Sequence, residues 1–89
     1  MSKIDRHREI CNQLNKIYEK KNHDYGDSFG NTYEKLGIIS AVTRITDKYN
    51  RLCSLATKEA EVEDETIEDT LMDMANYCIM TLIEREKEM

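Results

Sequence analysis

The distribution of helix-breaking residues is the feature that most constrains the fold of this 89-residue chain. Proline is absent, and the three glycines, at positions 26, 30 and 37, all fall in one short region. Because proline and glycine interrupt helices most strongly, long helices are expected on both sides of that region. The segment between residues 22 and 33 reads NHDYGDSFGNTY, and its Asn, Asp, Ser and Gly content predicts a turn.

Hydrophobic residues spaced three and four apart predict three main helices, at about 2–21, 34–57 and 66–86. Ser2 and Thr66 are the expected N-caps of the first and third helices, since a hydroxyl oxygen can accept a free N–H at a helix start. Residues 1–89 should therefore form a single all-α domain. In the second helix the apolar spacing is that of helices packed lengthwise on one another, at Ile38, Val42, Ile45, Tyr49, Leu52 and Ala56.

The third predicted helix has two apolar stripes, whereas a helix on the surface of a monomer needs only one. The stripes are Ile67, Leu71, Met74, Cys78 and Leu82, and beside them Met72, Ala75, Ile79 and Ile83. We expect one stripe to face the chain's own helices and the other to face a second subunit, giving an oligomeric helical bundle, a homodimer or larger. A chain this short buries only about 60–65% of its unfolded surface, which also favours self-association. The alternative is one wide arc facing the chain's own core.

Charge and cysteine content limit the environment and the partners. The net charge of −5 argues against binding to duplex DNA or to an anionic membrane, both of which favour basic surfaces. No apolar stretch is long enough to span a membrane, and the charged N-terminus does not resemble a signal peptide, so we expect a cytoplasmic protein. The three cysteines lack metal-site spacing and are expected to be small buried hydrophobes, at positions 11, 53 and 78.

Two charged rows follow the predicted second and third helices. The basic row contains Arg44, Lys48 and Arg51, with Asp47 on the same face. The acidic row consists of Glu65, Asp69 and Asp73, which have i, i+4 spacing. Asn76 and Tyr77 follow it on the next turn. If the two helices pair antiparallel, residues whose numbers add to about 120 become neighbours, which places acid beside base along the pair.

Two interpretations of these rows remain open. The first is a ladder of salt bridges that fixes the helix register, each contributing about 0–1 kcal/mol. The second is a phosphate site, in which Glu65, Asp69 and Asp73 hold Mg²⁺ and Lys48 and Arg51 hold phosphoryl oxygens. The glycine region extends the second interpretation, since an aromatic side chain there could stack on a base or else plug the end of the bundle. We expect Phe29 to be the plug and Tyr25 to lie near the ligand.

Three sequence blocks in order give the chain a family resemblance: KNHDYGDSFGNTYEKLG, RITDKYNRL and DETIEDTLMDMANYCIMTLIE. Together they resemble the phage and bacterial nucleotide modification associated domain type one, a group related to the MazG-like all-α NTP pyrophosphohydrolases. The resemblance covers about residues 20–84 and implies a helical, oligomeric fold with a nucleotide-derived ligand. By matching positions it implies a loop motif at Asp24, Tyr25 and Gly26 and a basic pair at Lys48 and Arg51. It also implies a third-helix motif at Glu65, Asp69, Asp73, Asn76 and Tyr77.

The chain departs from the MazG-like pattern at the helix that precedes the acidic one. Where those hydrolases carry an ExxE metal pair, this helix carries Arg44, Asp47, Lys48 and Arg51. The sequence therefore predicts binding of a nucleotide or nucleotide-derived phosphate, with Mg²⁺-dependent phosphoanhydride hydrolysis if the site is catalytic. One alternative is a non-catalytic phage anti-defence protein that sequesters a nucleotide signal, cyclic or linear. The other is a structural helix-pairing module without a ligand.

Overall fold

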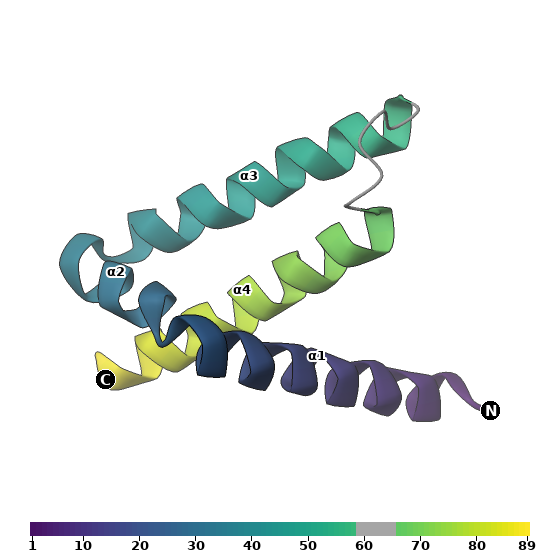
Figure 1. Cartoon of the computed structure of the whole chain (residues 1–89), viewed down its shortest axis with the longest axis horizontal. Helices are drawn as coiled ribbons and strands as arrows, with labels where there is room; N and C mark the ends of the chain where they lie inside the picture. Colours follow the sequence, from purple (N-terminus) through teal and green to yellow (C-terminus); the bar gives the residue numbers. More distant parts are fainter. Residues whose placement is uncertain (59–65) are drawn as a thin grey trace.

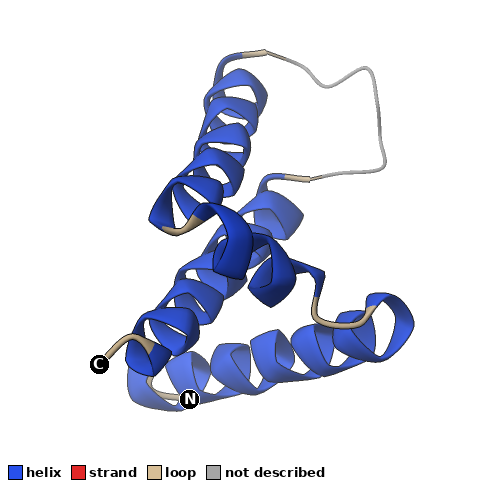
Figure 2. Cartoon of the chain, turned by 90° about the vertical axis from the view of Figure 1, so that its left-hand side faces the viewer, coloured by secondary structure: helices blue, strands red, loops and turns tan. Residues whose placement is uncertain are grey.

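The computed structural model describes residues 1–58 and 66–89, and this part of the chain is built from α-helices (Figure 1). They are α1 (Lys3–Tyr25), α2 (Ser28–Leu36), α3 (Ile38–Thr57) and α4 (Ile67–Lys87). α3 and α4 run side by side in roughly opposite directions, the short α2 contacts both, and α1 lies across α4 (Figures 1 and 2). None of the described helices has the length and apolar character needed to cross a membrane.

The all-helical prediction is confirmed, but the expectation of three main helices is wrong, because the predicted turn contains most of a fourth helix, α2. The Asp27 side chain caps α2 by accepting the Gly30 N–H at 3.1 Å. Gly30 is suited to this helix because a Cβ there would collide with the Asp27 carboxylate. Gly26 and Gly37 adopt positive φ angles of 68° and 71°, which end α1 and separate α2 from α3. The first helix thus reaches Tyr25, and the second predicted helix is interrupted at residue 37.

Both predicted N-caps are confirmed. The Ser2 hydroxyl accepts the Asp5 N–H at 3.1 Å at the start of α1. At the start of α4 the Thr66 hydroxyl accepts the Asp69 N–H at 3.0 Å, while the Asp69 carboxylate accepts the Thr66 N–H at 3.3 Å. This reciprocal capping box fixes the first turn of α4.

The buried hydrophobic residues among the described ones are few, and all except Leu14 of α1 lie where α2 meets α3 and α4. Phe29, Tyr33 and Ala41 form the cluster, with Tyr77 and Met80 partly buried against it. The Phe29 side chain is 4% exposed, which confirms its expected role as a plug. Burial, followed by the nearby Glu88 carboxylate, raises the pKa of the Tyr33 phenol above its ordinary value of 10.0, so this ring packs in its neutral form.

The outward faces of the helices carry much of the apolar surface, whereas one stripe of the third predicted helix was expected to face the chain's own helices. The buried residues of α4 are all polar or charged: Thr70, Asn76, Thr81 and Glu84. Members of both predicted α4 stripes are exposed, so neither stripe supplies the chain's own core. The prediction of buried cysteines is wrong for the same reason, because Cys11, Cys53 and Cys78 all lie on outward faces and are exposed.

The capping box of α4 gives a stability prediction. We expect Thr66→Ala to lower the free energy of unfolding by about 1 kcal/mol, since the cap of the Asp69 N–H is lost. The matched control is Thr46→Ala, at an exposed position inside α3, where alanine is as good a helix former or better. Urea unfolding at one fixed protein concentration measures both, and equal midpoints for the two variants would contradict the prediction.

Candidate functional site

A pocket of about 350 Å³ opens where the end of α1 and the start of α2 meet α4. We call it the α1–α4 pocket. Its volume lies in the range of small-molecule sites, which is about 300–1,000 Å³. It is lined by Tyr18, Lys21, Asn22, Tyr25, Gly26, Asp27, Ser28, Phe29, Arg44, Asp73, Asn76, Tyr77 and Met80.

Stacked aromatic rings and a guanidinium form one wall of the α1–α4 pocket. The rings of Phe29 and Tyr77 stack with centroids 5.8 Å apart and an angle of 19° between their planes. The Arg44 guanidinium lies 5.3 Å from the centre of the Phe29 ring, and its Nη2 donates to the Thr32 hydroxyl at 3.4 Å. Ring contact and hydrogen bond together orient this cation, and a guanidinium has five N–H donors, enough to bind a ligand as well.

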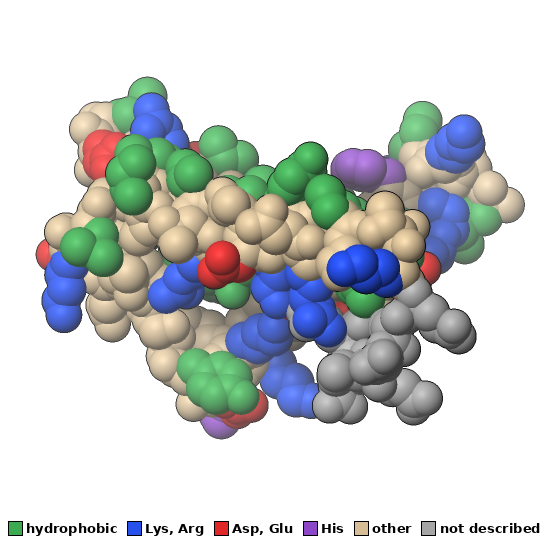
Figure 3. Space-filling model, turned by 90° about the horizontal axis from the view of Figure 1, so that it is seen from above, with side chains coloured by type: hydrophobic (Ala, Val, Ile, Leu, Met, Phe, Trp, Pro, Cys, Tyr) green, Lys and Arg blue, Asp and Glu red, His purple; other side chains and the backbone are tan. Residues whose placement is uncertain are grey.

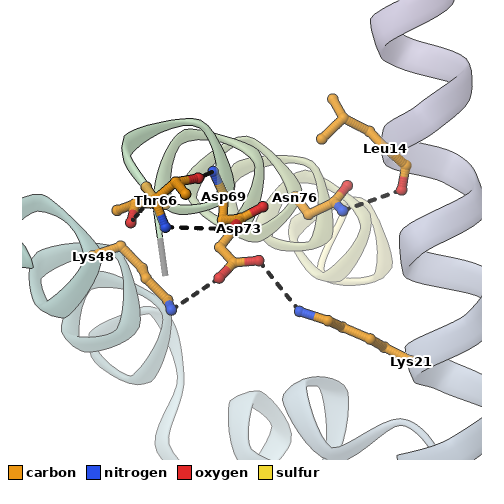
Figure 4. A network of polar contacts seen from close by, with 8 residues as sticks. Leu14, Lys21, Lys48, Thr66, Asp69, Asp73 and Asn76 are labelled. Atoms are coloured by element: carbon orange, nitrogen blue, oxygen red, sulfur yellow. Dashed lines mark hydrogen bonds and ion pairs between the residues drawn. The ribbon is translucent and has the colours of Figure 1, made fainter. Parts of the chain in front are cut away.

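A bridging carboxylate forms the charged part of the pocket (Figure 4). Asp73 on α4 accepts from Lys48 of α3 through Oδ2 at 2.9 Å and from Lys21 of α1 through Oδ1 at 3.2 Å. The Asp73 and Lys48 side chains are only about one-fifth exposed, whereas Lys21 is 59% exposed. The predicted pairing of residues 48 and 73 is thereby confirmed, and one carboxylate joins three helices.

A second polar contact positions α1 against α4. The Asn76 side-chain amide is buried and donates to the Leu14 carbonyl at 3.1 Å (Figure 4). Leu14 is the buried residue of α1. This hydrogen bond and the Lys21–Asp73 ion pair hold α1 across α4, so they set the width of the α1–α4 pocket.

Several predicted ligand-binding residues converge on this pocket. Tyr25, Gly26, Arg44, Asn76 and Tyr77 line it, as does the predicted metal ligand Asp73. Tyr25 is 75% exposed at the rim, in keeping with its expected place beside the ligand.

The other predicted residues have different surroundings. Asp24 is exposed beside the pocket, with its carboxylate 3.1 Å from the His23 ring nitrogen. Lys48 reaches the pocket only through Asp73, and Arg51 is partly buried one turn further along α3, outside the lining. Asp69 is held in the capping box of α4, and Glu65 lies outside the described residues.

The expected magnesium ligands do not form a complete site among the described residues. No group of three or more His, Cys, Asp or Glu side chains there has the arrangement to hold a metal ion. The carboxylates of Asp69 and Asp73 already accept hydrogen bonds from the Thr66 backbone and from two lysines. A magnesium site that includes Glu65 therefore stays a prediction.

Sequence reasoning missed the part of the pocket that α1 contributes. The missed residues Tyr18, Lys21 and Asn22 are spaced 3 and 1 apart, and the predicted Tyr25 follows three positions later, so all four share one face of a helix. The basic row was found by the same spacing. The α1 face was overlooked because the helix was expected to end at residue 21, whereas the chain remains helical until Gly26.

The comparisons with known proteins agree with the resemblance seen in the sequence blocks. Residues 21–84 match the family model described as nucleotide modification associated domain 1, and this range contains most of the residues that line the pocket. Searches of curated proteins and of solved structures gave no significant match. Because the family model covers well over half of the chain, the protein belongs to the nucleotide modification associated domain 1 family.

Proposed function

We propose that the chain binds a nucleotide or nucleotide-derived phosphate ligand in the α1–α4 pocket. The observation that carries the proposal is the composition of the pocket, which combines aromatic side chains with two cations, Lys21 and Arg44, in a volume of about 350 Å³. A nucleotide has the same two parts, a flat base and an anionic phosphate.

The cations of the pocket suit a phosphate. Arg44 is oriented by Phe29 and Thr32, and a guanidinium can bind two phosphate oxygens at once. Lys21 is largely exposed and adds a flexible point charge at the mouth. The phosphate would lie between these two side chains, near the oxygens of Asp73.

The aromatic and amide groups suit a base. Tyr18 and Tyr25 come from α1 and line the pocket together with the stacked Phe29–Tyr77 pair. A base stacked on such a ring gains about 1–3 kcal/mol. The side-chain amide of Asn22 can both donate and accept hydrogen bonds, which is what the edge of a base requires.

The contacts of Asp73 favour binding without hydrolysis. Each of its oxygens accepts from one lysine, and the positive charges of the two ammonium groups oppose the binding of a metal cation beside them in this arrangement. Sequestration of a nucleotide signal, cyclic or linear, is therefore our preferred form of the proposal. Mg²⁺-dependent hydrolysis is the second form, and it requires Asp73 to leave its lysines and act together with Glu65.

We predict that Lys21→Gln weakens the binding of nucleotide phosphates about tenfold, because one charge-assisted contact of about 1.5 kcal/mol is lost. The matched control is Lys20→Gln, an exposed neighbour that does not line the pocket. Isothermal titration calorimetry with nucleoside mono-, di- and triphosphates and cyclic nucleotides, with and without Mg²⁺, measures both. No binding of any of these ligands to the wild-type chain would overturn the proposed function.

Replacement of Asp73 distinguishes the two forms of the proposal. If the pocket binds phosphate without a metal, Asp73→Asn should tighten binding roughly three- to tenfold, because an anion near the phosphate is removed and two lysines are released. If Asp73 is a magnesium ligand, the same change should abolish Mg²⁺-dependent turnover and weaken binding in Mg²⁺. Asp47→Asn makes the same change in net charge at an exposed position outside the pocket and should leave affinity unchanged.

A further inference from the structure

A second cavity lies between α2 and the end of α4, and we call it the α2–α4 cavity. Its volume is about 510 Å³, which is within the usual range of about 300–1,000 Å³ for small-molecule sites. Asp27, the N-cap residue of α2, lines both this cavity and the α1–α4 pocket. The ionisable side chains of the α2–α4 cavity are Asp27, Tyr33, Glu34, Glu84, Lys87 and Glu88.

The two cavities differ in charge. The lining of the α1–α4 pocket has two basic and two acidic side chains. Figure 3, seen from the α3 side, also shows Lys and Arg side chains gathered beside the middle of α3. The lining of the α2–α4 cavity instead has four carboxylates and one ammonium group. This cavity therefore repels anions and attracts cations.

One of the four carboxylates is buried. The Glu84 side chain is 9% exposed, and Lys87 is its ion-pair partner among the described residues, with Nζ donating to Oε1 at 3.1 Å. Glu84 raises the pKa of the Lys87 ammonium above its ordinary value of 10.5, and Asp27 and Glu34 add to this effect. The Lys87 side chain itself is 65% exposed. The carboxylates of this cavity thus favour an ammonium group, although the one that the chain supplies lies mostly in solvent.

The Tyr33 hydroxyl is a second polar group in this cavity, and it has no hydrogen-bond partner in the described part of the chain. Tyr33 is only 5% exposed, and its hydroxyl oxygen is buried from solvent. Glu88, whose carboxylate acts on the phenol, also lines the cavity, so the hydroxyl end of the ring lies on the cavity side. Because a buried hydroxyl without a partner is unfavourable, this oxygen is an available acceptor for a bound donor.

The position of the carboxylates at the end of α4 makes a bound cation more favourable still. Glu84 lies in the last turn of α4, and Glu88 is its C-cap residue. The C-terminal end of a helix carries a partial negative charge, so carboxylates there are unfavourable and cations are favourable. Arg85 and Lys87 offset part of this charge, and a bound cation would offset more.

The arrangement of the carboxylates indicates the kind of cation. No group of three or more acidic side chains among the described residues is close enough together to hold a metal ion. Carboxylates spread around a cavity match a cation whose charges are also spread, and an ammonium group has three donors for such acceptors.

We propose that the α2–α4 cavity binds a small organic polyamine, with one ammonium group between Glu84 and the Tyr33 hydroxyl and another beside Glu34 on the rim. Glu84 accepts a charge-assisted hydrogen bond, and the hydroxyl accepts a further one. This site is different from the proposed nucleotide site and takes a ligand of opposite charge.

The first test is isothermal titration calorimetry with spermidine, putrescine and Mg²⁺, at an ionic strength of about 0.15 M and without nucleotide. We expect spermidine to bind, and Glu84→Gln to weaken its binding about tenfold, because a charge-assisted contact in a buried position is lost. Glu34→Gln changes an exposed residue and should weaken binding about threefold. The matched control is Glu86→Gln, an exposed acid of the same helix end that does not line the cavity, and it should leave affinity unchanged.

The second test separates a ligand contact from a structural role for Tyr33. Since the hydroxyl is unpaired in the chain, Tyr33→Phe should not lower the urea midpoint without spermidine, but it should weaken spermidine binding about fivefold. Circular dichroism shows that each variant has kept its helices.

Four results would overturn the proposal. They are no binding of spermidine to the wild-type chain, equal loss of affinity in the Glu86 and Glu84 variants, Mg²⁺ binding as tight as that of spermidine, and unchanged affinity in Tyr33→Phe. None of these measurements involves a nucleotide, so their outcome is independent of the proposed function of the α1–α4 pocket.

Discussion

The carboxylate of Asp73 is the contact on which the arrangement of this chain depends. It joins α4 to α3 through Lys48 and to α1 through Lys21, each oxygen serving one lysine. A carboxylate that is only about one-fifth exposed needs such partners, since an unpaired buried charge is strongly unfavourable. The position of α1, and with it the width of the α1–α4 pocket, thus follows from a polar contact.

A polar contact between α3 and α4 has a consequence for the rest of both helices. Each helix has one side turned toward the other, and that side is used by Lys48, Asp73 and the buried Thr70. The aliphatic residues must then occupy the remaining sides, and they are exposed in the single chain. The register that pairs Lys48 with Asp73 thus places polar residues between α3 and α4 and leaves apolar residues on the outer sides of both helices.

The sequence predicted the features that depend on helical periodicity and on local capping. Ser2 and Thr66 were recognised as N-caps, and the antiparallel register placed Lys48 beside Asp73. One local cap, at the start of α2, was missed. Glycine at position 30 was read as a breaker, although Asp27 caps a helix around it.

The largest error concerned which faces are buried. Apolar residues of α4, together with Cys78, were expected to include a core-facing stripe, but the chain's own core uses Phe29 and Tyr33 of α2 instead. Hydrophobic periodicity shows that a face will be covered, but it does not show whether the covering surface belongs to the same chain. The contribution of α1 to the site was missed for a related reason, since Tyr18 and Lys21 belong to it only because α1 crosses α4.

The proposed ligand pocket and the exposed apolar residues of α4 occupy different sides of this helix. Asp73, Asn76 and Tyr77 line the pocket, whereas Leu71 and Cys78 are exposed on another side of the helix. The polar contacts between the helices and the chemistry of the pocket are therefore linked, because Asp73 both holds α1 across α4 and sets the charge that a ligand meets in the lining.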